Sequence, residues 1–308
     1  MKRRQFLNLT AAAAATAALA SAGRAAAREA GPHIATNTYP WGTFARRDGK
    51  TFVTNTDEAL ATVASSGIRG YEPAITAVSA FDGLAGRLKQ HGLEMRSLYV
   101  NSVLHDPAQA EKSIADVLTI ARRAGETGTK IIVTNPSPIR GAGADAKTDD
   151  QLRGQARALD RLGAELRKLG IALAYHNHDV ELRHGAREYH HMLTATDPQN
   201  VKFCLDAHWV FRGCGNSQVA LFDTLEHYGS RIVELHLRQS RGGVWTEVFT
   251  ADGDIDYARL AGWLERKRMK PHLVLEQAVE KGSPQTLDGV AAHRQSLANA
   301  RQVFAALA

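Results

Sequence analysis

Cysteine is nearly absent from this chain, since only Cys204 and Cys214 occur among its 308 residues. Two cysteines cannot form a disulfide framework, so the fold must be held by a hydrophobic core, for which the 44% of hydrophobic residues is ample. One disulfide between the two remains the less favoured alternative, because Cys204 lies within a predicted strand and a chain of this size needs none.

Long apolar runs are also lacking, and beyond the N-terminus no stretch of ~18 apolar residues is present to span a bilayer. The first residues instead pair Arg3 and Arg4 ahead of Phe6 and Leu7, and an alanine-rich segment with small residues follows. This pattern predicts a secretory leader of the twin-arginine type over residues 1–28. Such a leader directs an already folded protein through the export machinery to the periplasm. No cysteine lies near the expected cleavage region, so a lipid anchor is not supported.

The leader also accounts for most of the positive charge. Residues 1–28 contain five basic residues and no acid, so cleavage there would lower the net charge from +6 to +1. The sequence pI of 9.4 is therefore no evidence for a nucleic-acid partner. A mature protein spanning residues 29–308 is expected to need no membrane contact after cleavage.

What the rest of the chain does contain is a strict alternation of strand and helix patterns. Eight such pairs in one domain predict a (β/α)8 TIM barrel. An open doubly wound sheet is the runner-up, but it normally carries a glycine-rich phosphate loop after its first strand, and "NTYPWGTF" is not one. The predicted strands span 33–39, 68–73, 93–100, 129–135, 171–178, 201–208, 231–238 and 272–277, and the predicted helices span 55–67, 79–91, 107–126, 148–169, 186–196, 216–228, 256–267 and 286–306.

Polar residues gather at the carboxyl ends of these strands, where a TIM barrel has its active site. Residues two apart on a strand share a face, so each pair of such residues can point into one pocket. Several imidazoles and carboxylates meeting there would repel one another or stay unsatisfied without a cation, which indicates a divalent metal site. The residues concerned are Glu72, His176, His178, Asp206, His208, Glu234, His236, Arg238 and Glu276.

The motifs "YHNHDVEL", "FCLDAHWV", "RIVELHLRQS", "GDID" and "LVLEQ", in this order, resemble the xylose-isomerase-like barrels known as sugar phosphate isomerases/epimerases. The resemblance covers essentially the whole chain after the leader. It implies one divalent metal (Mn, Zn, Co, Fe or Mg) with four protein ligands. Carried onto this chain, the ligands are His176, Asp206, His236 and Glu276. His176 departs from the pattern, because many members have Glu there, and His178 could take its role as ligand or substrate contact.

The resemblance also implies proton abstraction next to a carbonyl, giving an enediolate. Glu276 is then expected to act on one face of the substrate carbon, and Glu72, His178 and His208 are the candidates for the opposite face, with Glu72 weakly favoured. A structural alternative for Glu72 is a salt bridge to Arg69 or Arg96.

The expected substrate is a small carbohydrate, keto-sugar, cyclitol or glycoside rather than a sugar phosphate, because the chain is predicted to be exported. His208 and Arg238 are candidate substrate contacts, and Trp41 and Trp245, both in predicted loops, could stack on a sugar face or simply pack in the loops.

Several alternatives stay open at this point. A 3-keto-glycoside or cyclitol would allow elimination in place of reprotonation, which would make the protein a lyase or dehydratase. A non-catalytic sugar-binding barrel, a metal-dependent hydrolase and a homo-oligomer are also compatible with the sequence. An apurinic endonuclease of the same fold is disfavoured, because Trp209 stands where its motif has His. His190 and His191 are interpreted as surface residues of an outer helix.

Overall fold

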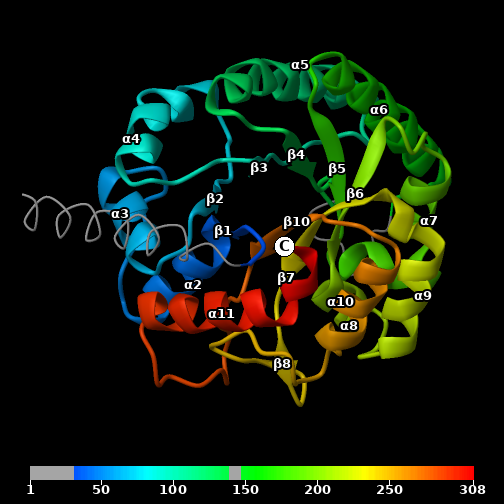
Figure 1. Ribbon diagram of the computed structural model, residues 1–308. Helices are drawn as coiled ribbons and strands as arrows, with labels where there is room; N and C mark the ends of the chain where they lie inside the picture. Colours follow the sequence, from blue (N-terminus) through cyan, green and yellow to red (C-terminus); the bar gives the residue numbers. More distant parts are fainter. Residues whose placement is uncertain (1–30, 139–146) are drawn as a thin grey trace, which may run out of the picture.

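The computed structural model describes residues 31–138 and 147–308, and the predicted leader lies outside them. Eight parallel strands form one sheet in the order β2-β1-β10-β7-β6-β5-β4-β3 (Figure 1). Backbone hydrogen bonds between the segments of β2 and β3, such as Tyr71 N to Glu94 O at 2.8 Å, bring the two edges together. The predicted single-domain (β/α)8 barrel is confirmed. Its strands are β1 (Ile34–Asn37), β2 (Gly70–Glu72), β3 (Ser97–Tyr99), β4 (Ile131–Thr134), β5 (Ala172–His176), β6 (Val201–Asp206), β7 (Ile232–Leu237) and β10 (His272–Leu275).

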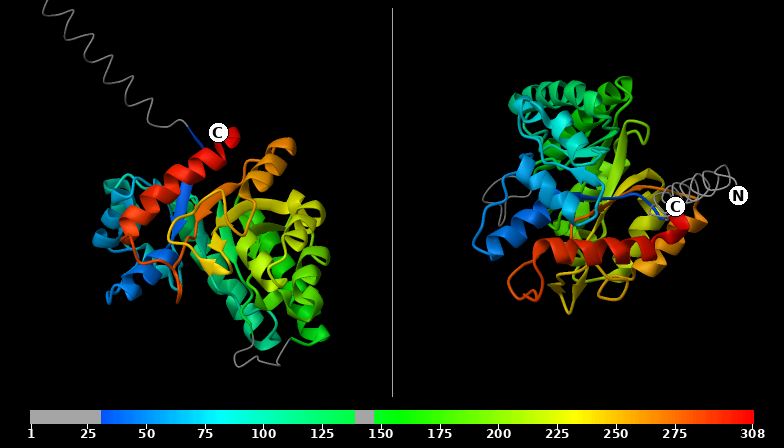
Figure 2. Two further views of the ribbon diagram at one scale, coloured as in Figure 1. Left: turned by 90° about the horizontal axis from the view of Figure 1, so that it is seen from below. Right: turned by 60° about the vertical axis from the view of Figure 1, so that its left-hand side comes forward.

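Helices surround the strands on the outside of the barrel (Figures 1 and 2). The helix α6 (Asp149–Lys168) illustrates why: a leucine or alanine recurs every three or four positions from Leu152 to Leu166 and turns one face to the core. Thr148 and Gln151 form a capping box at its start. The helices are α2 (Thr38–Arg47), α3 (Asp57–Ser65), α4 (Leu84–Gln90), α5 (Pro107–Ala124), α6 (Asp149–Lys168), α7 (Arg183–Thr194), α8 (Ala207–Gly213), α9 (Gln218–Tyr228), α10 (Tyr257–Arg266) and α11 (Gly289–Val303).

Two short helices and a hairpin differ from the sequence expectation. The first strand ends at Asn37, and α2 follows it, with Pro40 in the first turn where its missing N–H costs nothing. The sixth strand ends at Asp206, whose side chain caps α8, so the expectation that His208 lies on that strand is wrong. After β7 the chain forms a small hairpin, β8 (Ser240–Arg241) and β9 (Val244–Trp245), which the sequence pattern did not reveal.

Both cysteines are free, with Cys204 buried on β6 and Cys214 following α8, so the less favoured disulfide does not form. Within residues 31–138 and 147–308, no helix combines the length and the apolar character that crossing a membrane requires.

The prediction that Trp41 lies in a loop at the active-site end is wrong. It lies on α2, and its buried ring stacks on His293 of α11 with ring centroids 3.9 Å apart. Helices α2 and α11 lie side by side in Figures 1 and 2. A ring enclosed in this way cannot stack on a sugar, so Trp41 is a packing residue that joins the first and last helices.

His293 gives a stability prediction, because burial lowers its pKa from 6.5 to about 4. Between these values the unfolded chain binds a proton that the folded chain does not, so stability falls as pH falls through this window, by about 1.4 kcal/mol per pH unit for this residue. We expect His293→Phe, which keeps an aromatic ring against Trp41, to have a shallower slope in urea unfolding between pH 6.5 and 4.5. Parallel slopes for the two proteins would contradict this assignment.

Candidate active site

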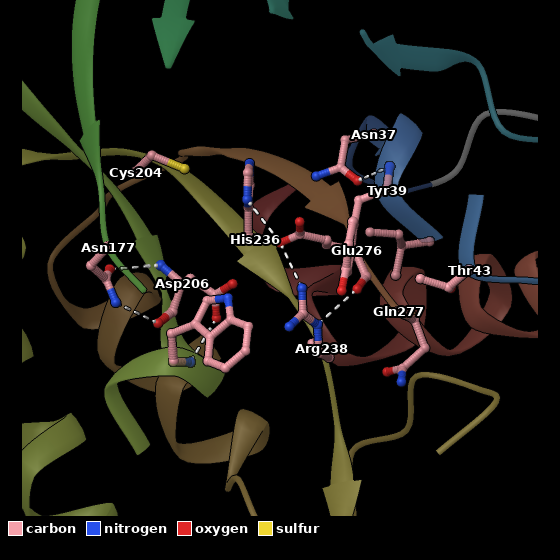
Figure 3. Close-up of polar contacts among 12 residues, drawn as sticks. Asn37, Tyr39, Thr43, Asn177, Cys204, Asp206, His236, Arg238, Glu276 and Gln277 are labelled. Carbon is pink, nitrogen blue, oxygen red and sulfur yellow. Dashed lines mark hydrogen bonds and ion pairs between the residues drawn. The ribbon is translucent and has the colours of Figure 1, made fainter. Parts of the chain in front are cut away.

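Four side chains converge at the carboxyl ends of neighbouring strands. His176 ends β5, Asp206 ends β6, His236 lies on β7 and Glu276 directly follows β10. One ligand atom from each lies within 4.8 Å of the others, and all four residues are buried. Figure 3 shows Asp206 on one side of His236 and Glu276 on the other.

Sheet register brings these residues together. Asp206 and His236 are direct partners on β6 and β7, and Glu276 extends the next ladder through a bond from its N–H to Leu237 O at 3.0 Å. Because all the strands are parallel, residues that end them meet at one rim of the barrel. The structure therefore brings together four of the residues that the strand-end rule placed at one rim.

The spacing His-Asn-His after β5 has a structural reason. The Asn177 amide bonds both the N–H and the carbonyl of Asp206, each at 3.3 Å, as a further rung between β5 and β6 (Figure 3). The two flanking imidazoles are left on the pocket side, with ring centroids 4.8 Å apart and nearly perpendicular. Glu181 holds the turn by accepting the N–H of His178 at 2.6 Å.

Glu276 is held as a carboxylate. Burial opposes its ionisation, but Arg238 and His236 outweigh burial and hold its pKa well below the usual range. Its Oε2 lies 3.0 Å from Arg238 Nη2 and 3.1 Å from His236 Nδ1. One carboxylate oxygen thus sits between two cationic or donor groups at the centre of the site.

Asp206 and His176 carry atoms that the protein itself does not satisfy. Asp206 Oδ1 accepts Trp209 N at 2.9 Å and caps α8, whereas Oδ2 has no hydrogen-bond partner among the described residues. His176 Nδ1 is likewise buried without a partner there. Burial raises the pKa of Asp206 to about 7, despite the opposing Arg238, and lowers that of His176. These two unsatisfied lone pairs, beside the second imidazole of His236 and the carboxylate of Glu276, fit the ligand set of a divalent cation.

A second group of acids lies behind His236. Glu72 Oε1 is 3.1 Å and Glu234 Oε1 3.2 Å from His236 Nε2, and both carboxyl groups are fully buried. Ser97 Oγ donates to Glu72 at 2.6 Å, so the sequence-based alternative of a bridge to Arg69 or Arg96 is not what the structure has. Burial and the adjacent Glu72 raise the pKa of Glu234 well above its ordinary value.

Arg238 is enclosed by aromatic rings. Its Cζ lies 4.3 Å from the ring centroid of Trp245, 5.1 Å from that of Trp209 and 5.6 Å from that of Tyr39. Trp245 was expected at the site, and the structure brings it there on β9. Tyr39 and Trp209 were missed, because each lies on a short helix, α2 or α8, that the sequence pattern did not predict.

This geometry defines a class of protein: a (β/α)8 barrel with histidine and carboxylate side chains clustered at the carboxyl ends of its strands. The chain belongs to the xylose isomerase-like TIM barrel family, whose model matches residues 60–302.

The chain is similar to three proteins of known name or structure. Inosose dehydratase from Lacticaseibacillus casei is 28% identical over 123 residues, which are 35% of this chain and 40% of that protein. A 3-keto-D-glucoside 4-epimerase from E. coli aligns with a TM-score of 0.65 at 16% identity, over 87% of this chain and 98% of that one. A xylose isomerase-like barrel from Mycobacterium smegmatis in complex with magnesium aligns with a TM-score of 0.64 at 16% identity, over 91% and 99%.

Proposed function

We propose that the protein is a divalent-metal-dependent sugar isomerase or epimerase acting on a keto-sugar or related carbohydrate. The observation that carries this proposal is the cluster of four buried residues whose ligand atoms lie within 4.8 Å of one another. Two of these residues, Asp206 and His176, have a buried polar atom with no hydrogen-bond partner in the described part of the chain. Family membership supports a sugar isomerase, epimerase or lyase, and the relatives' names include both epimerases and a dehydratase.

His176, Asp206, His236 and Glu276 would hold the metal. When bound, a divalent ion at this position supplies Lewis acidity to a substrate carbonyl oxygen. The mixed nitrogen and oxygen donors suit Mn, Zn, Co, Fe or Mg and do not select one of them.

The protein's own groups would then handle the proton. Glu276 is an ionised carboxylate and is therefore competent to accept the proton next to the substrate carbonyl, leaving an enediolate. For the opposite face we favour His178 over Glu72. His178 is half-buried and, because burial lowers its pKa to about 4, has a free lone pair at neutral pH, whereas Glu72 is enclosed behind His236. Arg238, with Nη1 unpartnered, is suited to hold a substrate oxygen.

A lyase or dehydratase is the second candidate, and two observations favour it. One relative is named inosose dehydratase, and His176 makes this donor set one negative charge poorer than a set with Glu at that strand. The same initial proton abstraction would then expel a leaving group on the neighbouring carbon. A 3-keto-glycoside or a keto-cyclitol has such a group.

The test is a metal assay combined with solvent exchange. The purified protein is loaded separately with Mn, Zn, Co, Fe and Mg and incubated in deuterated water with ketohexoses, 3-keto-glucosides and inososes. We expect deuterium at the carbon next to the carbonyl of at least one sugar, lost on chelation. An isomerised product supports the first proposal and a released leaving group the second. Sugar binding without metal and without exchange would instead support a non-catalytic sugar-binding barrel and overturn both.

We also propose that the chain is exported to the periplasm through the twin-arginine pathway, so that its substrate is a free sugar or glycoside rather than a sugar phosphate. The pair Arg3 and Arg4 ahead of Phe6 supports this. The double substitution Arg3→Lys and Arg4→Lys is expected to retain the precursor in the cytoplasm, as measured by cell fractionation. The same double substitution at Arg24 and Arg28 is the control, and equal export of all forms would contradict the proposal.

A further inference from the structure

A chain of hydrogen bonds runs from the rim of the site to an outer loop. His208 Nε2 lies 2.9 Å from Ser240 Oγ, and Ser240 Oγ donates to Asp254 Oδ2 at 2.7 Å. Asp254 also accepts the N–H of Gly242 at 2.9 Å and of Gly243 at 2.7 Å. The three side chains come from α8, from β8 and from the loop that follows β9, so tertiary packing alone assembles them.

The protons available to the three side chains fix which group donates in each of these hydrogen bonds. Burial opposes ionisation of Asp254, but the hydrogen bonds from Gly243, Ser240 and Gly242 outweigh it and lower its pKa, so Asp254 has no proton to give. The single Ser240 proton therefore goes to Asp254, and Ser240 can only accept from His208. The His208 ring must then carry its proton on Nε2. His208 Nδ1 is buried and has no hydrogen-bond acceptor among the described residues, so nothing there holds a second proton and Nδ1 keeps its lone pair.

We propose that Asp254 and Ser240 are positioning residues that fix His208 as the Nε2–H tautomer, so that its Nδ1 is a permanent hydrogen-bond acceptor in the substrate-binding wall. The inference rests on the proposed sugar chemistry for its purpose, although the tautomer itself is a property of the protein alone.

The surroundings of His208 indicate what this acceptor recognises. Its ring packs edge-on against Trp245, centroids 6.0 Å apart, and Trp209, 6.2 Å apart, the two indoles that also enclose Arg238. Three buried nitrogens there have no partner among the described residues: two donors, Arg238 Nη1 and Trp245 Nε1, and one acceptor, His208 Nδ1. Substrate hydroxyl groups, each with one proton and two lone pairs, can satisfy such donors and such an acceptor. This part of the wall therefore suits a hydroxyl-rich ligand such as a sugar.

Imidazole ¹⁵N NMR of the full chain labelled at histidine reads the tautomer directly, with His208→Gln to assign the signal. We expect the wild type to give the pattern of a neutral Nε2–H ring. Ser240→Ala should lose that single pattern, and Ser240→Thr, which keeps the hydroxyl, should restore it. Ser296→Ala is the matched control, because Ser296 is a buried serine that accepts Phe249 N at 3.0 Å away from His208.

An Nδ1–H or doubly protonated His208 in the wild type, or a Ser240→Ala spectrum identical to wild type, would overturn the proposal. This result stands whether or not any sugar is turned over, so it is independent of failure of the proposed function. For a sugar that shows exchange, Ser240→Ala is expected to raise KM by about tenfold with a smaller change in kcat, as for loss of one oriented hydrogen bond. An equal effect in Ser296→Ala would point to a merely structural role for Ser240.

Discussion

Replacing Asp206 with Asn is expected to abolish tight metal binding and to lower the rate of substrate proton exchange by about 10³-fold or more, because a Lewis acid supplies several kcal/mol at the transition state. Asn keeps the size of the side chain and remains a good helix cap, so α8 should still begin at Ala207. What the substitution removes is the carboxylate oxygen Oδ2, which has no hydrogen-bond partner among the described residues. Metal content after dialysis and deuterium exchange are the two measurements.

Asp288→Asn provides the matched control for this experiment. Asp288 caps α11 by accepting Ala291 N at 2.7 Å, just as Asp206 caps α8, but it lies outside the ligand cluster. Both variants should therefore unfold at denaturant concentrations close to one another and differ only in metal content and exchange. Full metal occupancy in Asp206→Asn, or equal losses in both variants, would remove Asp206 from the ligand set.

The barrel and the position of its site could be predicted because both depend on local pattern. Strand and helix periods alternate eight times, and polar residues at strand ends must meet at one rim once the strands are parallel. That rule placed His176, Asp206, His236 and Glu276 at the rim among nine polar residues, and the family resemblance singled them out as ligands. The structure brings the four together.

The aromatic enclosure of Arg238 could not be predicted, because it depends on packing between distant segments. Tyr39 and Trp245 are more than two hundred positions apart in the chain, and nothing local to either specifies the other. The short helix α8 could not be predicted for a related reason. Its segment "AHWVFRG" contains Trp, Val and Phe, which favour strands. The cap by Asp206 and the contacts of Phe211 with the core are what stabilise the helix. Asp-Ala-His-Trp is the one signal that could have revealed it, since Asp is a preferred N-cap.

Glu72 ends its strand as predicted, and the direction of its side chain is what the sequence could not give. Strand position alone puts a carboxylate at the rim, but the side chain turns behind His236 and bonds Ser97. In that place its effect on the reaction is indirect. Glu234 accepts the Nε2–H of His236 at 3.2 Å, and the Glu72 carboxylate lies 3.1 Å from the same nitrogen. Outer carboxylates of this kind orient an imidazole that holds a metal, the role proposed for His236, and raise its basicity. Glu72 as catalytic base stays a prediction, and the geometry favours this positioning role instead.

Two substitutions separate these roles. His178→Gln is expected to lower kcat by about 10²- to 10⁴-fold, the usual range for a general acid or base, and to leave metal affinity nearly unchanged. Glu72→Gln is expected to weaken metal affinity by about 10- to 100-fold, the effect of losing an outer carboxylate partner of a ligand. Added metal should then restore most of the exchange rate in Glu72→Gln and none of it in His178→Gln. Metal titration followed by deuterium exchange at saturating metal gives both quantities.

The contrast is informative because the two residues differ in access as well as in chemistry. His178 is half-buried beside Trp209, with ring centroids 5.8 Å apart, so it can exchange a proton with substrate and solvent. Glu72 has no exposed surface, and its pKa is about 2, because His236 and the hydrogen bonds to it outweigh the cost of burial. Without exposed surface, the Glu72 carboxylate cannot contact a substrate carbon while His236 stays in place. If Glu72→Gln stayed inactive at saturating metal while His178→Gln remained active, the assignment of the two roles would be reversed. Glu72 would then have to reach the substrate through a rearrangement of His236.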